Sequence, residues 1–259
     1  MKTEIRFHEG LKGSGVVVSV THGDHRLMFD FGAPFRPDTN FYDGVILHRN
    51  ENTLKDAIRL GETVSVDGIY PEKNLTMFDG SLFRNIQPFE ASDMKTAVLI
   101  SHLHLDHMSN IKHLHEGVPV YMHHHGAELL KALENIDEGT PHDNIVPVEY
   151  GDKIQHGKLL VTPYFSDHPC YGSAGYLIEA PDMTIYYSDR PEIMLGWFDA
   201  DDRWLLRFKF LDRYEGISAT KVRNLMLYDG AVDIISSIVP NFVAMHLQEI
   251  IKYLKGDTE

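Results

Sequence analysis

The chain has 259 residues, 43% of them hydrophobic, and a net charge of −14 at pH 7, as expected for a folded domain that can bury a core. No apolar run reaches the roughly 18 residues of a membrane span, and the charged first residues contain no apolar signal segment, so we expect a cytoplasmic protein. The single cysteine, Cys170, excludes an internal disulfide and a cysteine-based zinc ribbon. The negative charge disfavours long nucleic acid as a partner, since such binding depends on Lys and Arg contacts to phosphates.

The first part of the chain predicts strands joined by a tight turn. Ile5 and Phe7 alternate with charged residues, as in an edge strand. Residues 16–20 and 27–30 are mostly apolar and flank a turn at 22–24, which predicts a hairpin.

The next segment is irregular, because prolines and an Asp-Gly pair interrupt residues 34–44. Within it, Leu54, Ala57 and Ile58 have helical spacing, so we expect a helix at 53–60.

Four ligating side chains follow a short apolar strand at 97–100, in the run Ser101-His102-Leu103-His104-Leu105-Asp106-His107. His102 and His104 lie on the same side of an extended segment, because side chains alternate along it. The aspartate and the histidine after the bend can face a second point. The loop therefore suits two metal ions.

The second half of the chain alternates strands and helices. We expect helices at 111–115, 127–133, 233–239 and from 247 on, a helix and a loop in 199–214, and strands at 119–122, 145–150, 159–164, 173–179, 184–189, 224–228 and 241–246. Further ligating residues follow or end three of these strands, namely His168, Asp189 and His246.

The run from Ser101 to His107 is similar to the signature of the metallo-β-lactamase-fold hydrolases, and the residues around His168 and Asp189 resemble ribonuclease J-like members. The resemblance implies an α/β (α+β) fold, a four-layer αββα sandwich with two mixed sheets face to face, helices outside and the metal site at one edge. A single domain would then span residues 1–259. The gap from Asp189 to His246 is too short for the domain that ribonuclease J-type enzymes insert there.

The resemblance also implies the ligands. One ion would be held by His102, His104 and His168, and the other by Asp106, His107 and His246, with Asp189 as the bridge. Asp30, in an Asp-x-Gly pattern, would support the metal loop without binding metal. Ser188 stands where the family has glycine, which puts the geometry of Asp189 in question.

This implied centre would hold two divalent metal ions, with zinc as the first choice and manganese or iron as alternatives. The family crosses from the early strand to the metal motif in fewer residues, so we interpret residues 33–90 as an insertion or a flap within the domain.

The function implied is that of a binuclear metal-dependent hydrolase in which a hydroxide between the two ions is the nucleophile and Asp106 and Asp189 serve catalysis. We favour a phosphodiester substrate, small or a short nucleotide, as in nucleases and phosphodiesterases. A thioester or lactone is the alternative within this fold, and a non-catalytic metal-binding scaffold or sensor is the alternative outside catalysis. Tyr171 or one of the additional histidines would be the general acid.

The remaining histidines receive plainer interpretations. The run His22-Gly23-Asp24-His25 resembles a metal motif, but we interpret it as a solvated turn. His123-His124-His125 ends a strand, and we interpret it as structural or surface-exposed. His113 and His115 would support the site or lie on the surface. Cys170 would be a small residue near the site and not a ligand.

Overall fold

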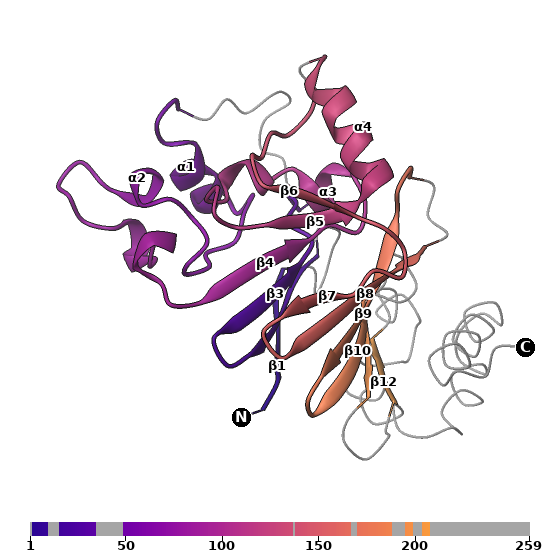
Figure 1. Cartoon of the computed structure of the whole chain (residues 1–259). Helices are drawn as coiled ribbons and strands as arrows, with labels where there is room; N and C mark the ends of the chain where they lie inside the picture. The colour runs from indigo at the N-terminus through magenta and orange to yellow at the C-terminus, as the bar shows by residue number, and fades with distance from the viewer. Residues whose placement is uncertain are drawn as a thin grey trace, which may run out of the picture.

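The computed structural model describes residues 2–9, 16–34, 49–136, 138–166, 170–187, 195–198 and 204–207. Two six-stranded sheets pack face to face, and the helices of this part of the chain cover the outer face of the first sheet (Figure 1). This arrangement agrees with the predicted layers of helices and facing sheets. The helices predicted at 233–239 and from 247 on lie outside the described residues.

The first sheet is mixed, and its strands follow one another in chain order. It contains β1 (Glu4–Glu9), β2 (Val17–His22), β3 (His25–Phe29), β4 (Lys95–Leu99), β5 (Val120–His123) and β6 (Ile145–Val148). The first three strands are antiparallel, and β3 to β6 run parallel. The predicted hairpin is confirmed, with His22 opposite His25 across the turn.

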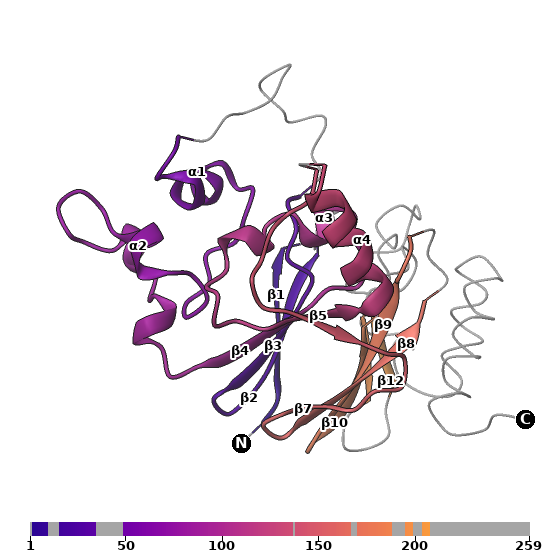
Figure 2. The same cartoon turned by 45° about the horizontal axis from the view of Figure 1, so that its top comes forward.

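Short helices form the layer above the first sheet (Figure 2). They are α1 (Thr53–Leu60), α2 (Glu72–Leu75), α3 (Leu105–Met108) and α4 (His124–Glu134), with 3₁₀ turns at Phe83–Asn85, Phe89–Ala91 and Ile111–His113. The helix predicted at 53–60 is confirmed, and it ends at Gly61, whose φ of 72° is the left-handed conformation that glycine adopts easily.

Residues 49–90, which belong to the segment interpreted as an insertion or flap, pack onto the first sheet. Leu54, Ile69 and Tyr70 are buried in one apolar cluster with Val98 and Ile100 from β4 and the residue after it. Burying each such side chain contributes about 1.5–3 kcal/mol to stability. This part of the segment is therefore core of the domain, while its status as an insertion stays a prediction.

The second sheet is antiparallel in every described strand pair, whereas two mixed sheets were predicted. Its strands are β7 (Ile154–His156), β8 (Leu159–Phe165), β9 (Ala174–Ala180), β10 (Met183–Tyr187), β11 (Leu195–Phe198) and β12 (Trp204–Arg207). The helix and loop predicted in 199–214 are wrong for residues 204–207, which pair with β11. The charges on either side of this short apolar run suggested surface structure, but aromatic and aliphatic residues favour a paired strand.

A second apolar cluster fills the space between the sheets. Phe29 of β3 packs against Tyr176 and Tyr187 of the opposite sheet, with ring centroids 6.0 Å and 5.0 Å apart. These aromatic contacts hold the end of β3 against the ends of β9 and β10. No helix in the described ranges has the length and apolar character needed to cross a membrane.

Candidate metal centre

The predicted metal loop leaves the first sheet at the carboxyl end of β4, between two parallel neighbours. Leu99 pairs with Phe29 of β3 and with Tyr121 of β5. The residues after these strands, Asp30 and Ser101 among them, therefore emerge at the same edge of the sheet. Residue pairs that are far apart in sequence meet here because parallel strands end together.

Three histidines of the loop lie against one another. His102 Nε2 is 2.9 Å from His104 Nδ1, and the ring centroids of His102 and His107 are 4.0 Å apart. His107 Nε2 lies 3.6 Å from Asp106 Oδ2. Nitrogen ligands of a tetrahedral zinc ion with bonds of about 2.0–2.1 Å stand about 3.4 Å apart. The pair distances of 2.9 Å and 3.6 Å lie on either side of this value.

Asp30 is the carboxylate beneath this loop, and it is completely buried. Its oxygens accept hydrogen bonds from the Ser101 backbone nitrogen at 2.7 Å, the Ser101 hydroxyl at 2.9 Å and His107 Nδ1 at 2.7 Å. The Tyr187 hydroxyl of the second sheet also donates to it. The predicted supporting role of Asp30 agrees with these contacts, because they fix both Ser101 and the Nδ1 side of the His107 ring.

These bonds determine which ring nitrogens carry protons. A carboxylate only accepts, so His107 donates its Nδ1–H to Asp30 and keeps a lone pair on Nε2. The single Ser101 hydroxyl proton goes to Asp30, so its oxygen accepts the Nδ1–H of His102, 2.9 Å away. His102 therefore also keeps its Nε2 lone pair, which is the form of imidazole that binds a cation. The residues present fit a divalent metal ion.

Gly32 explains the Asp-x-Gly pattern. A Cβ atom on this residue would lie 2.1 Å from the carbonyl carbon of Asp106. The neighbouring residues bond the two segments, because Phe31 N donates to His107 O at 2.6 Å and Ala33 N to Leu105 O at 3.2 Å. Only glycine allows this close approach of the two backbones.

The second sheet braces the loop from the other side. Ala174 N donates to Ser101 O at 2.8 Å, and the Tyr176 hydroxyl donates to Ile100 O at 2.7 Å. The described structure thus brings His102, His104, Asp106 and His107 together. The other predicted ligands, His168, Asp189 and His246, lie outside the described residues, as does Ser188, and the whole ligand set stays a prediction.

The interpretation of residues 22–25 as a solvated turn is wrong for His22. The turn residues are Gly23 and Asp24, but the His22 side chain is buried, and its Nδ1 lies 3.0 Å from the hydroxyl of Thr3. Asp182, in the turn between β9 and β10, lies 4.0 Å from the same nitrogen, and local sequence does not reveal these contacts. His25, at the other end of the turn, pairs with Asp24 at 2.8 Å.

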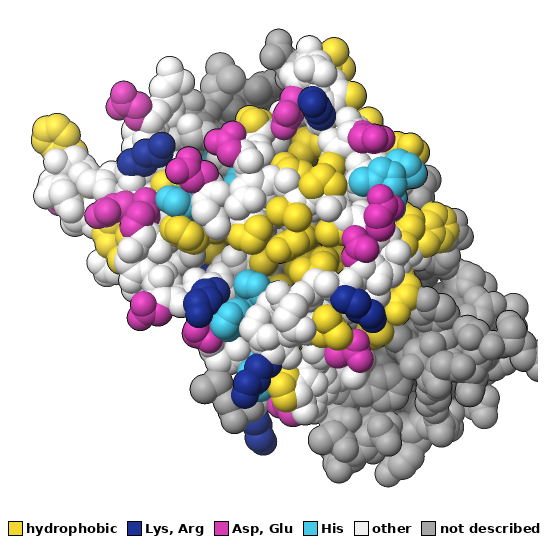
Figure 3. Space-filling model, in the orientation of Figure 1, with side chains coloured by type: hydrophobic (Ala, Val, Ile, Leu, Met, Phe, Trp, Pro, Cys, Tyr) yellow, Lys and Arg dark blue, Asp and Glu magenta, His cyan; other side chains and the backbone are white. Residues whose placement is uncertain are grey.

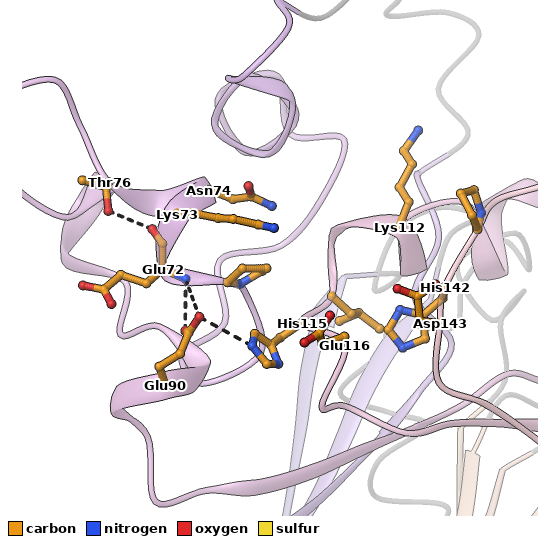
Figure 4. A pocket seen from close by; sticks show the side chains of 13 residues that line it. Glu72, Lys73, Asn74, Thr76, Glu90, Lys112, His115, Glu116, His142 and Asp143 are labelled. Carbon is orange, nitrogen blue, oxygen red and sulfur yellow. Dashed lines mark hydrogen bonds and ion pairs between the residues drawn. The ribbon is translucent and has the colours of Figure 1, made fainter.

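His113 ends the 3₁₀ turn Ile111–His113, and His115 follows it two residues later. His113 is buried, and His115 stacks on Phe89 at 4.1 Å between ring centroids. His115 also lines a polar pocket together with Glu72, Glu90 and His142 (Figure 4). The residues that line this pocket include none of the predicted metal ligands, so we do not assign it to the centre.

Cys170 and Tyr171 precede β9. Cys170 is partly buried and packs against the core cluster of the first sheet. Tyr171 is 56% exposed and stacks on His125 at 4.4 Å between ring centroids. Its role as general acid stays a prediction.

The run His123-His124-His125 brings its ring nitrogens together, which sequence reasoning did not expect. The three residues offer ligand atoms that all lie within 4.8 Å of one another. The signal in the sequence is three consecutive histidines at the end of a predicted strand, a pattern that also fits a structural or surface-exposed run.

Comparisons with known proteins agree with the predicted fold. Residues 76–189 match the model of the β-lactamase superfamily domain. A protein of unknown function from Enterococcus faecalis V583 is 26% identical with a TM-score of 0.57, and the match covers 73% of this chain and 43% of that chain. This chain therefore spans less than half of that relative.

Two other solved structures are similar to the chain with lower TM-scores. The subclass B3 metallo-β-lactamase MEM-A1, from a soil metagenome library, is 19% identical with a TM-score of 0.42, covering 73% of this chain and 61% of that chain. The metallo-β-lactamase fold protein YhfI from Bacillus subtilis is 16% identical with a TM-score of 0.38, covering 69% and 56%. Among proteins with curated descriptions, none matches the sequence significantly. The chain carries the metallo-β-lactamase fold, and its residues 76–189 are similar to the β-lactamase superfamily domain.

Proposed function

We propose that this chain is a metal-dependent hydrolase whose centre is built on the loop from His102 to His107. The observation that carries the proposal is the buried carboxylate of Asp30, which sets the tautomer of His107 directly and that of His102 through Ser101. A fold that encloses a carboxylate in order to orient two neighbouring imidazoles has the arrangement of a metal site.

The predicted ligands divide into the two groups given above, with zinc as the proposed metal and manganese or iron as alternatives. When bound, the two ions would supply a hydroxide nucleophile at neutral pH and polarise the bond that is cleaved. Asp30 holds the Nδ1 proton of His107, and the Ser101 oxygen holds that of His102. Both rings are thereby oriented before a cation or a substrate arrives, so little reorganisation is needed.

We propose a phosphodiester as the substrate, either a small molecule or a short nucleotide. His104 and Leu105 are exposed, so the loop is open on the side from which a substrate would approach. The net charge of −14 argues against a long polyanion. A thioester or lactone is the alternative substrate for the same ligands.

The test uses protein freed of metal and reloaded with zinc, manganese or iron. We expect reloading to restore cleavage of bis-p-nitrophenyl phosphate, and His104→Asn to lower kcat/KM by at least about 100-fold. His25→Asn, in the distant hairpin turn, is the matched control and should keep full activity. Elemental analysis of the same samples reports whether metal is bound.

Each other outcome has a definite meaning. Cleavage of a thioester or lactone but not of the phosphodiester would replace the substrate while keeping the centre. Bound metal without hydrolysis of any substrate would favour the scaffold or sensor. Failure to bind metal would overturn the proposed centre.

A further inference from the structure

We propose that His123, His124 and His125 bind a further transition-metal ion, separate from the predicted centre, with Glu149 as the negative group beside them. None of these residues belongs to the ligand set that the family resemblance implies. The proposed ion would tie the start of α4 to the residue after β6.

The three histidines meet because a strand passes directly into a helix. His123 is the last residue of β5 and the N-cap of α4, and the two following histidines form the first turn of that helix. Their ligand atoms lie within 4.8 Å of one another, against about 3.4 Å between the nitrogens of a tetrahedral zinc site. Closing this difference requires rotation of the rings, including release of His123 Nδ1 from the His125 backbone nitrogen, from which it accepts a hydrogen bond at 3.3 Å.

Aromatic contacts limit the movement of the outer two rings. His123 is buried and stacks on Tyr150 with 3.8 Å between ring centroids. His125 stacks on Tyr171 at 4.4 Å. Rings that are already held in place lose little freedom on binding, which favours a specific ion over a transient contact.

A buried nitrogen in the cluster points to a cation. His124 Nδ1 lies at an ion-pair distance of 2.8 Å from Glu149 Oε1, but within the described part of the chain this contact does not have the geometry of a hydrogen bond. The other carboxylate oxygen of Glu149 lies 3.8 Å from His123 Nε2. A positive ion would satisfy both the nitrogen and the carboxylate. Figure 3 shows a group of histidine side chains beside acidic ones at the margin of the molecule.

The carboxylate also decides against the competing ligand. The start of a helix attracts anions, so a phosphate group could also occupy this place. Glu149 lies against the histidines and would repel a phosphate, whereas it offsets the unfavourable effect of the helix dipole on a cation. Imidazole ligands suit zinc, copper, nickel or iron, and disfavour magnesium and calcium.

The proposed site is a neighbour of the predicted centre. Tyr150, which stacks on His123, donates its hydroxyl to Ser173 O at 2.8 Å. The next residue, Ala174, donates its backbone N–H to Ser101 O, at the start of the metal loop, at 2.8 Å. An ion at this place would therefore stiffen the wall beside the loop.

The test counts zinc bound to the full chain when free zinc is buffered in the low micromolar range. We expect the double variant His124→Asn and His125→Asn to bind one ion fewer per chain than wild type. The double variant His25→Asn and His156→Asn removes another pair of contacting imidazoles, whose centroids are 5.1 Å apart, and should keep the wild-type count. The double variant His102→Asn and His104→Asn should lose ions of the predicted centre but keep this one.

A second readout protects the test against misfolding. Zinc should raise the unfolding temperature of both proteins, and the increase should be larger for wild type than for the double variant at 124 and 125. Glu149→Gln changes an exposed side chain, so it should fold normally and weaken this ion's affinity about 10-fold. Equal ion counts in wild type and in the double variant at 124 and 125 would overturn the proposal. Loss of this ion from wild type under zinc buffering would also overturn it, because the ion would then be adventitious.

Discussion

Two histidine groups follow neighbouring parallel strands, one in the loop after β4 and the other at the start of α4 after β5. In the loop, the negative partner is Asp30, which is completely buried and joined to both sheets. At α4 it is Glu149, whose side chain is 62% exposed. The comparison shows two ways to orient imidazoles. In the loop, buried hydrogen bonds to one carboxylate orient the rings, whereas at α4 the outer rings are held by stacking on Tyr150 and Tyr171.

The largest difference should appear when the two carboxylates are removed. Asp30→Ala leaves buried donors without an acceptor and places alanine at a φ of 57°, so we expect a loss of about 4 kcal/mol in the free energy of unfolding. Glu149→Ala should cost less than about 0.5 kcal/mol in metal-free protein, because exposed ion pairs contribute little. Urea unfolding of both variants, without metal, measures this. Equal costs would remove the distinction between the two groups.

The glycines near each group provide a second test. Gly32→Ala forces a Cβ to 2.1 Å from the Asp106 carbonyl carbon, so we expect a loss of about 3 kcal/mol and displacement of the metal loop. Gly126→Ala, in α4, meets its nearest atom at an ordinary 3.8 Å. We expect stability that is unchanged or up to about 1 kcal/mol higher, because alanine favours a helix. Thermal unfolding compares them, and a tolerated Gly32→Ala would show that the loop adapts.

The smallest predicted difference in stability between the two groups comes from removing one tyrosine hydroxyl beside each of them. Tyr187→Phe removes a buried donor to the Asp30 carboxylate, so we expect a loss of about 2 kcal/mol and weaker metal binding at the loop. Tyr150→Phe removes a partly buried bond to the Ser173 carbonyl, so we expect about 1 kcal/mol. The visible absorption of bound cobalt measures metal binding, and urea unfolding measures the loss of stability. A larger loss for Tyr150→Phe would reverse the assignment of the more strongly organised group.

Much of the local structure follows from the sequence because its causes are local. The apolar run at 97–100 predicts the strand that carries the metal loop, and the spacing at 54–58 predicts α1, since strand and helix periods act over a few residues. The closeness of His102 and His104 has the same origin. By contrast, the charged residues around 204–207 led to a wrong prediction of a helix and a loop. The segment is a strand because it pairs with β11.

The sequence by itself therefore determined the strand that leads into the loop and the closeness of His102 and His104 within it. Tertiary structure decided how the histidine rings of the loop are oriented, because Asp30 and Ser101 are separated by 71 residues and meet only where β3 and β4 lie parallel. It also brought Glu149 and Tyr171 to the histidines of α4, each from a different segment. Contacts of this kind depend on how sheets pack, and sheet packing is a property of the whole core rather than of any short stretch of residues.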